Sequence, residues 1–271
     1  MPELPEVETT VRGLARHLDG VRIERVVLNR PDMRFPFPDG LGQRLTGATV
    51  TALGRRAKYG LIHSDRGDTL VFHLGMSGRW RIDPAAPDRH DHLLLEAGGR
   101  VFALNDPRRF GFVDLVATAG LHEWPAFAAM GPEPLGDDLT ARHLHAAFAG
   151  RRQAVKLLLL DQRIVAGLGN IYVCEALWRA RISPTRAAGR VSLAALERLV
   201  PAIREVLEQS IREGGSTLRD FAGPSGELGY FAKAFAVYGR EGEPCPRNDG
   251  GAVRRIVQGG RSTWYCSRCQ R

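Results

Sequence analysis

The chain has 271 residues, of which 44% are hydrophobic and 25% charged, a balance typical of a folded protein. A chain of this length can bury a core without disulfide bonds. Its net charge of +8 favours a polyanionic partner such as nucleic acid, although arginines on a solvated surface would give the same excess. The sequence has no stretch apolar enough to span a bilayer and no secretion signal at its start, so we expect a cytoplasmic protein without membrane association.

The N-terminal half predicts one helix followed by a block of strands. Pro5 suits a first helical turn, and Val7 and Val11 recur at helical spacing before Gly20 ends the pattern. From residue 21 to about residue 116, short β-branched runs alternate with turns, which predicts an antiparallel sandwich or barrel. We expect the strands at residues 21–28, 49–53, 59–63, 69–74, 92–96, 101–104 and 111–116.

The remainder of the chain predicts helices and then a small β tail, so the fold class is α+β. Pro201 is expected to kink or divide the last helix. We expect helices at residues 140–149, 154–160, 171–180 and 192–212, and tail strands at 253–258 and 262–266. Domains are predicted at residues 1–130, 131–235 and 236–271.

The first residues of the chain could supply a nucleophilic amine with an acid or base beside it. Met1 is normally removed when proline follows it, which leaves a secondary amine on Pro2. A terminal amine titrates near about 8, and the positive end of the following helix disfavours its protonated form. Glu3 places an acid or base beside this nucleophile, and an amine that attacks a sugar C1′ forms an iminium that promotes phosphate elimination. Taken alone, however, these residues favour the simpler interpretation of a well-capped helix start.

The start of the chain, residues 1–9, resembles that of bacterial formamidopyrimidine-DNA glycosylases, in the formamidopyrimidine-DNA glycosylase/endonuclease VIII family. The resemblance continues, in the family's order, at residues 55–59, 73–78, 90–92, 106–111, 131–135, 167–172 and 238–240 and in the cysteine-containing tail. It implies an N-terminal helix with an antiparallel β-sandwich, a helix–two-turn–helix DNA-binding domain and a C-terminal β-hairpin finger. It also implies a monomeric repair glycosylase and lyase that excises 8-oxoguanine and formamidopyrimidines from double-stranded DNA and cleaves the strand by β,δ-elimination.

The resemblance assigns the catalytic roles position by position. It implies Pro2 as the Schiff-base nucleophile and Glu3 as general acid and base. It implies Lys58 as the proton donor for β-elimination and Arg261 as the group that assists δ-elimination. Without the resemblance, Lys58 would be a phosphate-binding or solvated charge, and Arg261 an exposed charge at a hairpin tip.

Excision from a duplex requires the damaged nucleotide to be flipped out and the gap to be filled. The resemblance gives this role to Met76, Arg108 and Phe110. Met and Phe can wedge into a base stack, and Arg can hydrogen-bond to the orphaned base. A lone Met or Phe is more often a core residue, but the turn residues around both favour exposure.

Phosphate contacts are expected mainly from the helical half. Asn170 is expected to cap the helix that follows it, so that neighbouring N–H groups meet a phosphate. Further phosphate contacts are expected from His90, Arg151, Arg152 and Lys156. The Gly/Pro-rich residues 216–231 are expected to form a mobile lid over the flipped purine, and Glu6 either lines the pocket below it or is a helix-end charge.

The tail departs from the family, whose finger binds zinc through two cysteine pairs. Cys266 and Cys269 form one pair, but Asn248 stands where the partner of Cys245 belongs. Three thiolates could still hold zinc with water or with the nearest carboxylate, Asp249. The alternative is a metal-free β-hairpin that keeps its shape through Trp264, Tyr265, Val253 and Ile256 and depends on packing against the helical domain. Cys174 is a poor fourth ligand, because we expect it to be a buried apolar residue on a helix of the other domain.

Two other functions remain open at this point. One is an endonuclease VIII-like glycosylase for oxidised pyrimidines, and the other is a damaged-DNA-binding protein without catalysis. Leu4 and the residues 108–110 resemble the purine enzyme.

Overall fold

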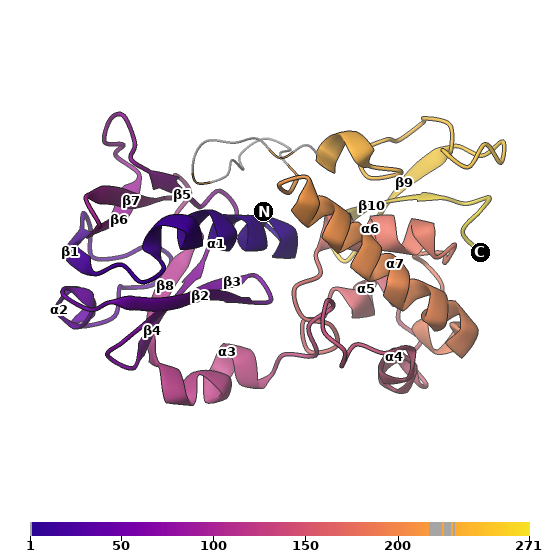
Figure 1. Cartoon of the computed structure of the whole chain (residues 1–271). Coiled ribbons are helices and arrows are strands. Elements are labelled where there is room, and N and C mark those ends of the chain that lie inside the picture. The colour runs from indigo at the N-terminus through magenta and orange to yellow at the C-terminus, as the bar shows by residue number, and fades with distance from the viewer. Residues whose placement is uncertain (1, 217–223, 225–228, 230) are drawn as a thin grey trace. The chain divides into compact units, whose positions relative to one another are not determined.

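A computed structural model describes residues 2–216, 224, 229 and 231–271, which form two compact units (Figure 1). The sandwich unit comprises Met1–Ala128 and Ile211–Ala232, and the helical unit comprises Ala129–Ser210 and Lys233–Arg271. Most of the expected lid, residues 216–231, lies outside the described residues. The division into three domains stays a prediction.

Helix α1 (Leu4–Leu18) begins the sandwich unit. Glu3 is its N-cap, and a capping box forms in which the Glu3 backbone N–H donates to the Glu6 carboxylate at 2.9 Å. One face of the helix, including the fully buried Leu14, packs against strands β2 (Val50–Arg56) and β3 (Tyr59–Ser64). The helix ends before Gly20, which has a φ of +73° that glycine adopts without strain.

The strands of this unit form two four-stranded antiparallel sheets, so the predicted sandwich is confirmed. Their orders are β1-β6-β7-β5 and β2-β3-β4-β8. The alternation of apolar residues places one apolar core between the sheets and α1. The strands are β1 (Ile23–Leu28), β2 (Val50–Arg56), β3 (Tyr59–Ser64), β4 (Asp68–His73), β5 (Arg79–Ile82), β6 (Asp91–Ala97), β7 (Arg100–Asn105) and β8 (Phe112–Ala117).

Strand β5 was not predicted, nor were the short helices α2 (Leu41–Leu45), η1 (Thr118–Glu123) and α3 (Pro125–Ala128). Strand β5 has four residues, two of them arginines, and only Trp80 is deeply buried. So short a charged run gives no period-2 pattern, and its pairing with β7 fixes it instead.

The helical unit contains the expected helices, which bury apolar faces against one another. Helix α7 runs through Pro201 as one helix, so the proline does not divide it. The helices are α4 (Ala141–Phe148), α5 (Val155–Leu159), α6 (Asn170–Arg179), η2 (Ala188–Arg190), α7 (Leu193–Arg212) and η3 (Phe231–Ala234).

The tail is a β-hairpin of β9 (Val253–Gln258) and β10 (Arg261–Cys266), packed through β10 against α6. The buried carboxylate of Glu175 on α6 accepts hydrogen bonds at 2.8–3.0 Å from the backbone N–H groups of residues 236–238. Burial raises the pKa of Glu175 despite these donors. Beside it, Cys174 packs with Val237 and Val253, as an apolar core residue. The tail is therefore anchored by buried polar bonds as well as by its own small core.

Candidate active site and metal site

The proposed nucleophile lies at the start of α1. Pro2 and Glu3 are buried, and both precede α1, whose N-terminal end carries a partial positive charge. Glu6 is 2% exposed and accepts from the backbone N–H and the hydroxyl of Ser216, both at 2.8 Å. Glu6 thus joins the helix start to the chain segment that leads into residues 217–223, which are outside the described residues.

Lys58 lies in the turn between β2 and β3, where it is only 7% exposed. The preceding Ala57 has a φ of +52°. Arg55 supports the turn, because it donates to the Ala57 carbonyl at 2.9 Å and to Glu8 at 2.8 Å. Burial opposes ionisation of Glu8, but its bonds to Arg55 and Arg12 outweigh this and lower its pKa. The turn that carries Lys58 is therefore joined to α1 by the Arg55–Glu8 ion pair.

His73, at the end of β4, supports the next turn. Burial, together with the positive charge of Lys58, lowers the pKa of His73 to about 4, so its ring is neutral at physiological pH. Its Nδ1 atom accepts the backbone N–H of Gly75 at 3.1 Å. A neutral His73 therefore helps to hold the turn of residues 74–78.

The three residues expected to fill the gap are exposed on loops of the sandwich unit. Met76 is 36% exposed and Phe110 46% exposed, as the surrounding turn residues predicted. The Arg108 guanidinium lies 4.7 Å from the centre of the Phe110 ring. Their role in filling the gap stays a prediction.

Asp106 is a residue of this site to which sequence reasoning gave no role. It is completely buried and accepts from the Ser77 hydroxyl at 2.6 Å and from the Gly111 N–H at 2.8 Å. Its backbone bonds to the segment that contains His90: the Asp106 N–H donates to the His90 carbonyl at 3.0 Å, and the Asp106 carbonyl lies 2.8 Å from His92 Nε2. An aspartate followed by proline signals a turn, but it does not reveal which side chain across the fold will meet it.

Asn170 and Lys156, two expected phosphate contacts, have partners within the protein. Asn170 is the first residue of α6 and is not its cap; Gly169 is, without a side-chain bond. The Asn170 amide instead donates to the Ser262 carbonyl at 2.9 Å. Lys156 is fully buried, and its ammonium donates to the Thr263 hydroxyl at 2.6 Å. Both side chains therefore hold the hairpin to the helices, and their roles in DNA binding stay predictions.

The remaining expected residues lie as follows. Arg151 and Arg152 are exposed before α5, and Arg261 is exposed at the start of β10. His90 is half-buried, and its backbone N–H donates to Asp88 at 2.8 Å. The ligand roles of these side chains stay predictions.

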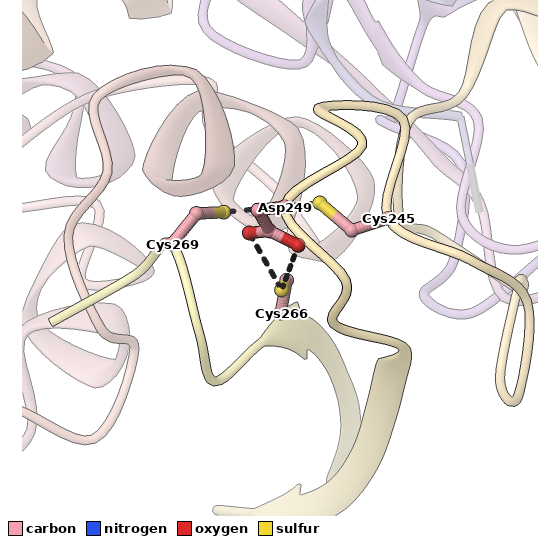
Figure 2. A group of neighbouring side chains, drawn as sticks. All are labelled: Cys245, Asp249, Cys266 and Cys269. Carbon is pink, nitrogen blue, oxygen red and sulfur yellow. Dashed lines mark hydrogen bonds between the residues drawn. The ribbon is translucent and has the colours of Figure 1, made fainter.

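The tail brings together three cysteines and one aspartate. The ligand atoms of Cys245, Asp249, Cys266 and Cys269 all lie within 4.8 Å of one another. Figure 2 shows the three sulfur atoms and the carboxylate pointing toward a common centre. The Asp249 carboxylate lies 3.5 Å from Cys266 Sγ and also accepts the Gly251 N–H at 2.8 Å. Burial and the neighbouring Cys266 raise the pKa of Cys269 to about 12.

The loop conformation explains how aspartate reaches this cluster. Asn248, at the position of the family's missing cysteine, has a φ of +52° and is exposed. Arg247 anchors the loop to α6, because it donates to the Trp178 carbonyl at 3.1 Å and stacks on the Trp178 ring. Asp249, which follows Asn248, consequently turns its carboxylate toward the thiols.

The chain matches two family models. Residues 1–113 match the formamidopyrimidine-DNA glycosylase N-terminal domain, and residues 130–222 match the formamidopyrimidine-DNA glycosylase H2TH domain. The chain belongs to the formamidopyrimidine-DNA glycosylase family. Proteins named formamidopyrimidine-DNA glycosylase from Erythrobacter litoralis and Novosphingobium aromaticivorans are 74% and 71% identical to it, each over the whole of both chains.

Solved structures of this family resemble the chain as a whole. A mutant FPG from Lactococcus lactis, in complex with DNA containing Fapy-dG, is 32% identical, with a TM-score of 0.92 over all of both chains. The MutM (FPG) protein of Thermus thermophilus is 40% identical, with a TM-score of 0.89 over 99% of this chain and 98% of its own. The membership confirms the α+β fold with its helix–two-turn–helix element. Among the described residues, no helix is long and apolar enough to cross a membrane.

Proposed function

We propose that this chain excises oxidised purines from duplex DNA through a Schiff base on the amine of Pro2, and then cleaves the strand. The observation that carries the proposal is the position of Pro2 and Glu3, buried together at the N-terminal end of α1 in a chain of this family. The partial positive charge of a helix N-terminus keeps the amine unprotonated, and therefore nucleophilic.

The reaction follows from that amine. Its nitrogen attacks the sugar C1′ and loses its proton, the bond from C1′ to the base breaks, and the base leaves with a proton supplied by Glu3 or water. The C1′–O4′ bond then breaks, O4′ takes a proton from Glu3 or water, and the opened sugar is held to Pro2 as an iminium. The resulting iminium withdraws electrons, so loss of a proton from C2′ breaks the C3′–O bond, and a second elimination breaks the C5′–O bond. Lys58 serves the first elimination and Arg261 the second. The nucleophile exists only after Met1 has been removed, because an amide nitrogen is not basic.

The partner in this proposal is damaged double-stranded DNA, bound by a monomer. Arg151, Arg152 and His90 contact phosphates, and the positive N-terminal end of α6 offers a further phosphate site. Met76, Arg108 and Phe110 occupy the space that the flipped nucleotide vacates. The oxidised-pyrimidine activity is not favoured, because the relatives named above all carry the formamidopyrimidine name.

The tail in this proposal binds one zinc ion through Cys245, Cys266, Cys269 and Asp249. Three thiolates and a carboxylate form a tetrahedral set of the kind that zinc accepts, and their ligand atoms are already gathered. Four potential anions so close together repel one another unless a cation lies between them. The metal would supply structure to the hairpin and take no part in the reaction.

Borohydride trapping tests the activity. The purified chain is incubated with a duplex containing 8-oxoguanine opposite cytosine, and reduction fixes any Schiff base as a covalent complex. We expect a complex that is lost in Pro2→Gly. Trapping only on thymine glycol would support the pyrimidine enzyme instead, and an absence of trapping with binding retained would support a non-catalytic binder.

A further inference from the structure

Two separate loops of the sandwich unit carry the side chains proposed to fill the gap. The 74–78 turn carries Met76, and the 106–111 loop carries Arg108 and Phe110. All three side chains are exposed. Exposed side chains on loops act together on one base pair only if the loops are held in a fixed relation. The structure contains a group that does this.

That group is the carboxylate of Asp106, which is completely buried. Its Oδ1 atom accepts the Ser77 hydroxyl of the 74–78 turn at 2.6 Å. Its Oδ2 atom accepts the Gly111 N–H at the end of the 106–111 loop at 2.8 Å. Hydrogen bonds to a carboxylate are shorter and stronger than neutral ones, so a single side chain joins the two loops firmly.

The backbone of Asp106 adds a third connection, toward the segment that contains His90. The Asp106 N–H donates to the His90 carbonyl at 3.0 Å. The Asp106 carbonyl lies 2.8 Å from Nε2 of the buried His92. Asp106 is thereby fixed from both sides, and its carboxylate cannot follow one loop without moving the other.

The two loops also touch directly, so that a shift in one is transmitted to the other. A Cβ atom on Gly75 would lie 2.3 Å from the Gly111 backbone nitrogen, and Gly75 has a φ of +59°. Only glycine permits this approach. Direct backbone contact together with the carboxylate makes the two loops one rigid element.

We propose that Asp106 is a positioning residue that holds Met76, Arg108 and Phe110 in register, and that recognition of the base opposite the lesion depends on it. This inference rests on the proposed function, because it takes Arg108 as the group that meets the orphaned base. An arginine discriminates bases through the direction of its hydrogen bonds, so a small displacement of the loop weakens discrimination before it weakens phosphate binding.

The test compares Asp106→Asn with wild type, and Ser77→Ala with Ser77→Thr. Asparagine keeps the shape of Asp106, but its NH2 group cannot accept a hydrogen bond where one carboxylate oxygen did. Ser77→Ala removes the hydroxyl that donates to Asp106, whereas Ser77→Thr keeps a hydroxyl at this position. For each variant, kcat and KM are measured for excision of 8-oxoguanine opposite cytosine and opposite adenine. Cleavage at a preformed abasic site and the melting temperature are measured in parallel.

We expect Asp106→Asn and Ser77→Ala to lower kcat for excision by about tenfold or more and to narrow the preference for cytosine over adenine. KM and abasic-site cleavage should stay within about twofold of wild type, since phosphate contacts and Pro2 are unaffected. Ser77→Thr should behave as wild type. An unchanged cytosine preference in Ser77→Ala would overturn the inference, even if Asp106→Asn failed to fold. Failure of the wild-type chain to excise or cleave would instead reject the proposed function.

Discussion

The sandwich unit and the tail hold functional side chains by different means. The sandwich has an apolar core that spans both sheets and α1, and its loops are fixed on that base by a buried carboxylate. The tail contributes only Val237 and Val253 to a small buried cluster that Cys174 of α6 completes. It is anchored by polar bonds to Glu175 and Lys156, and it gathers the four residues proposed to bind zinc. A large core makes a loop rigid through hydrogen bonds alone, whereas a small hairpin needs a metal or equivalent crosslinks.

The largest expected effect is the loss of ordered structure in the tail when the proposed zinc ion is removed. Structural zinc contributes on the order of 10 kcal/mol to small domains, far more than the tail's core can supply. We expect chelation, or Cys266→Ser, to accelerate hydrogen exchange throughout residues 240–271 while the sandwich strands keep their protection. Unchanged exchange in the tail after the zinc content has fallen to zero would show that the hairpin stands without metal.

The ligand role of Asp249 is tested by a matched pair at adjacent positions. We expect Asp249→Ala to weaken zinc affinity by about tenfold or more, because a first-sphere donor is lost, and Asn248→Ala to leave the affinity unchanged. Cobalt substitution provides a spectroscopic check, since Asp249→Cys should add a fourth thiolate and intensify the sulfur-to-metal absorption. Equal zinc affinities in the two alanine variants would remove Asp249 from the ligand set.

A smaller effect separates anchoring from DNA binding at two neighbouring basic residues. Lys156→Met leaves the buried Thr263 hydroxyl without its charged donor, although the Ser262 carbonyl keeps its bond from Asn170, so we expect a loss of about 3 kcal/mol of unfolding free energy. Arg152→Met should leave stability unchanged and reduce the salt dependence of DNA affinity by about one phosphate contact. Melting curves and salt titrations would show the opposite pattern if Lys156 were the phosphate ligand.

The smallest expected effect concerns pH and the sandwich unit. The pKa of His73 is about 4 in the folded chain, against 6.5 normally, so the unfolded chain binds more protons between these values. His73 therefore contributes stability that is complete above about pH 6.5 and is lost as pH falls toward 4. We expect about 2 kcal/mol less stability at pH 5 than at pH 8 from this residue. His73→Asn keeps an acceptor for Gly75 but does not titrate, so its unfolding free energy should fall less than that of wild type between pH 8 and pH 5. The same fall in both proteins would assign the loss of stability to other groups.

Sequence patterns predicted the parts of the fold that depend on local periodicity. The alternation of short β-branched runs with turns predicted seven of the eight strands of the sandwich. Strand β5 was not predicted because its formation depends on pairing with β7 more than on its own residues. Side-chain partners distant in sequence could not be predicted either. Lys156 meets Thr263 after 107 residues, and Ser77 meets Asp106 after 29.

The candidate site shows the same limit. The exposure of Met76 and Phe110 followed from the turn residues beside them. The cluster around Asp249 was foreseen only as a nearby carboxylate, because its direction depends on the backbone at Asn248. Family resemblance supplied the catalytic roles, which neither composition nor spacing could have assigned.

The central claim is that the amine of Pro2 is the nucleophile, and peptide mapping of the trapped complex tests it most directly. After borohydride reduction on 8-oxoguanine DNA, nuclease and protease digestion leave a sugar remnant on one peptide. The account predicts that this peptide begins at Pro2, lacks Met1 and carries the remnant on its terminal nitrogen. A remnant on Lys58, or on a peptide that retains Met1, would contradict the account.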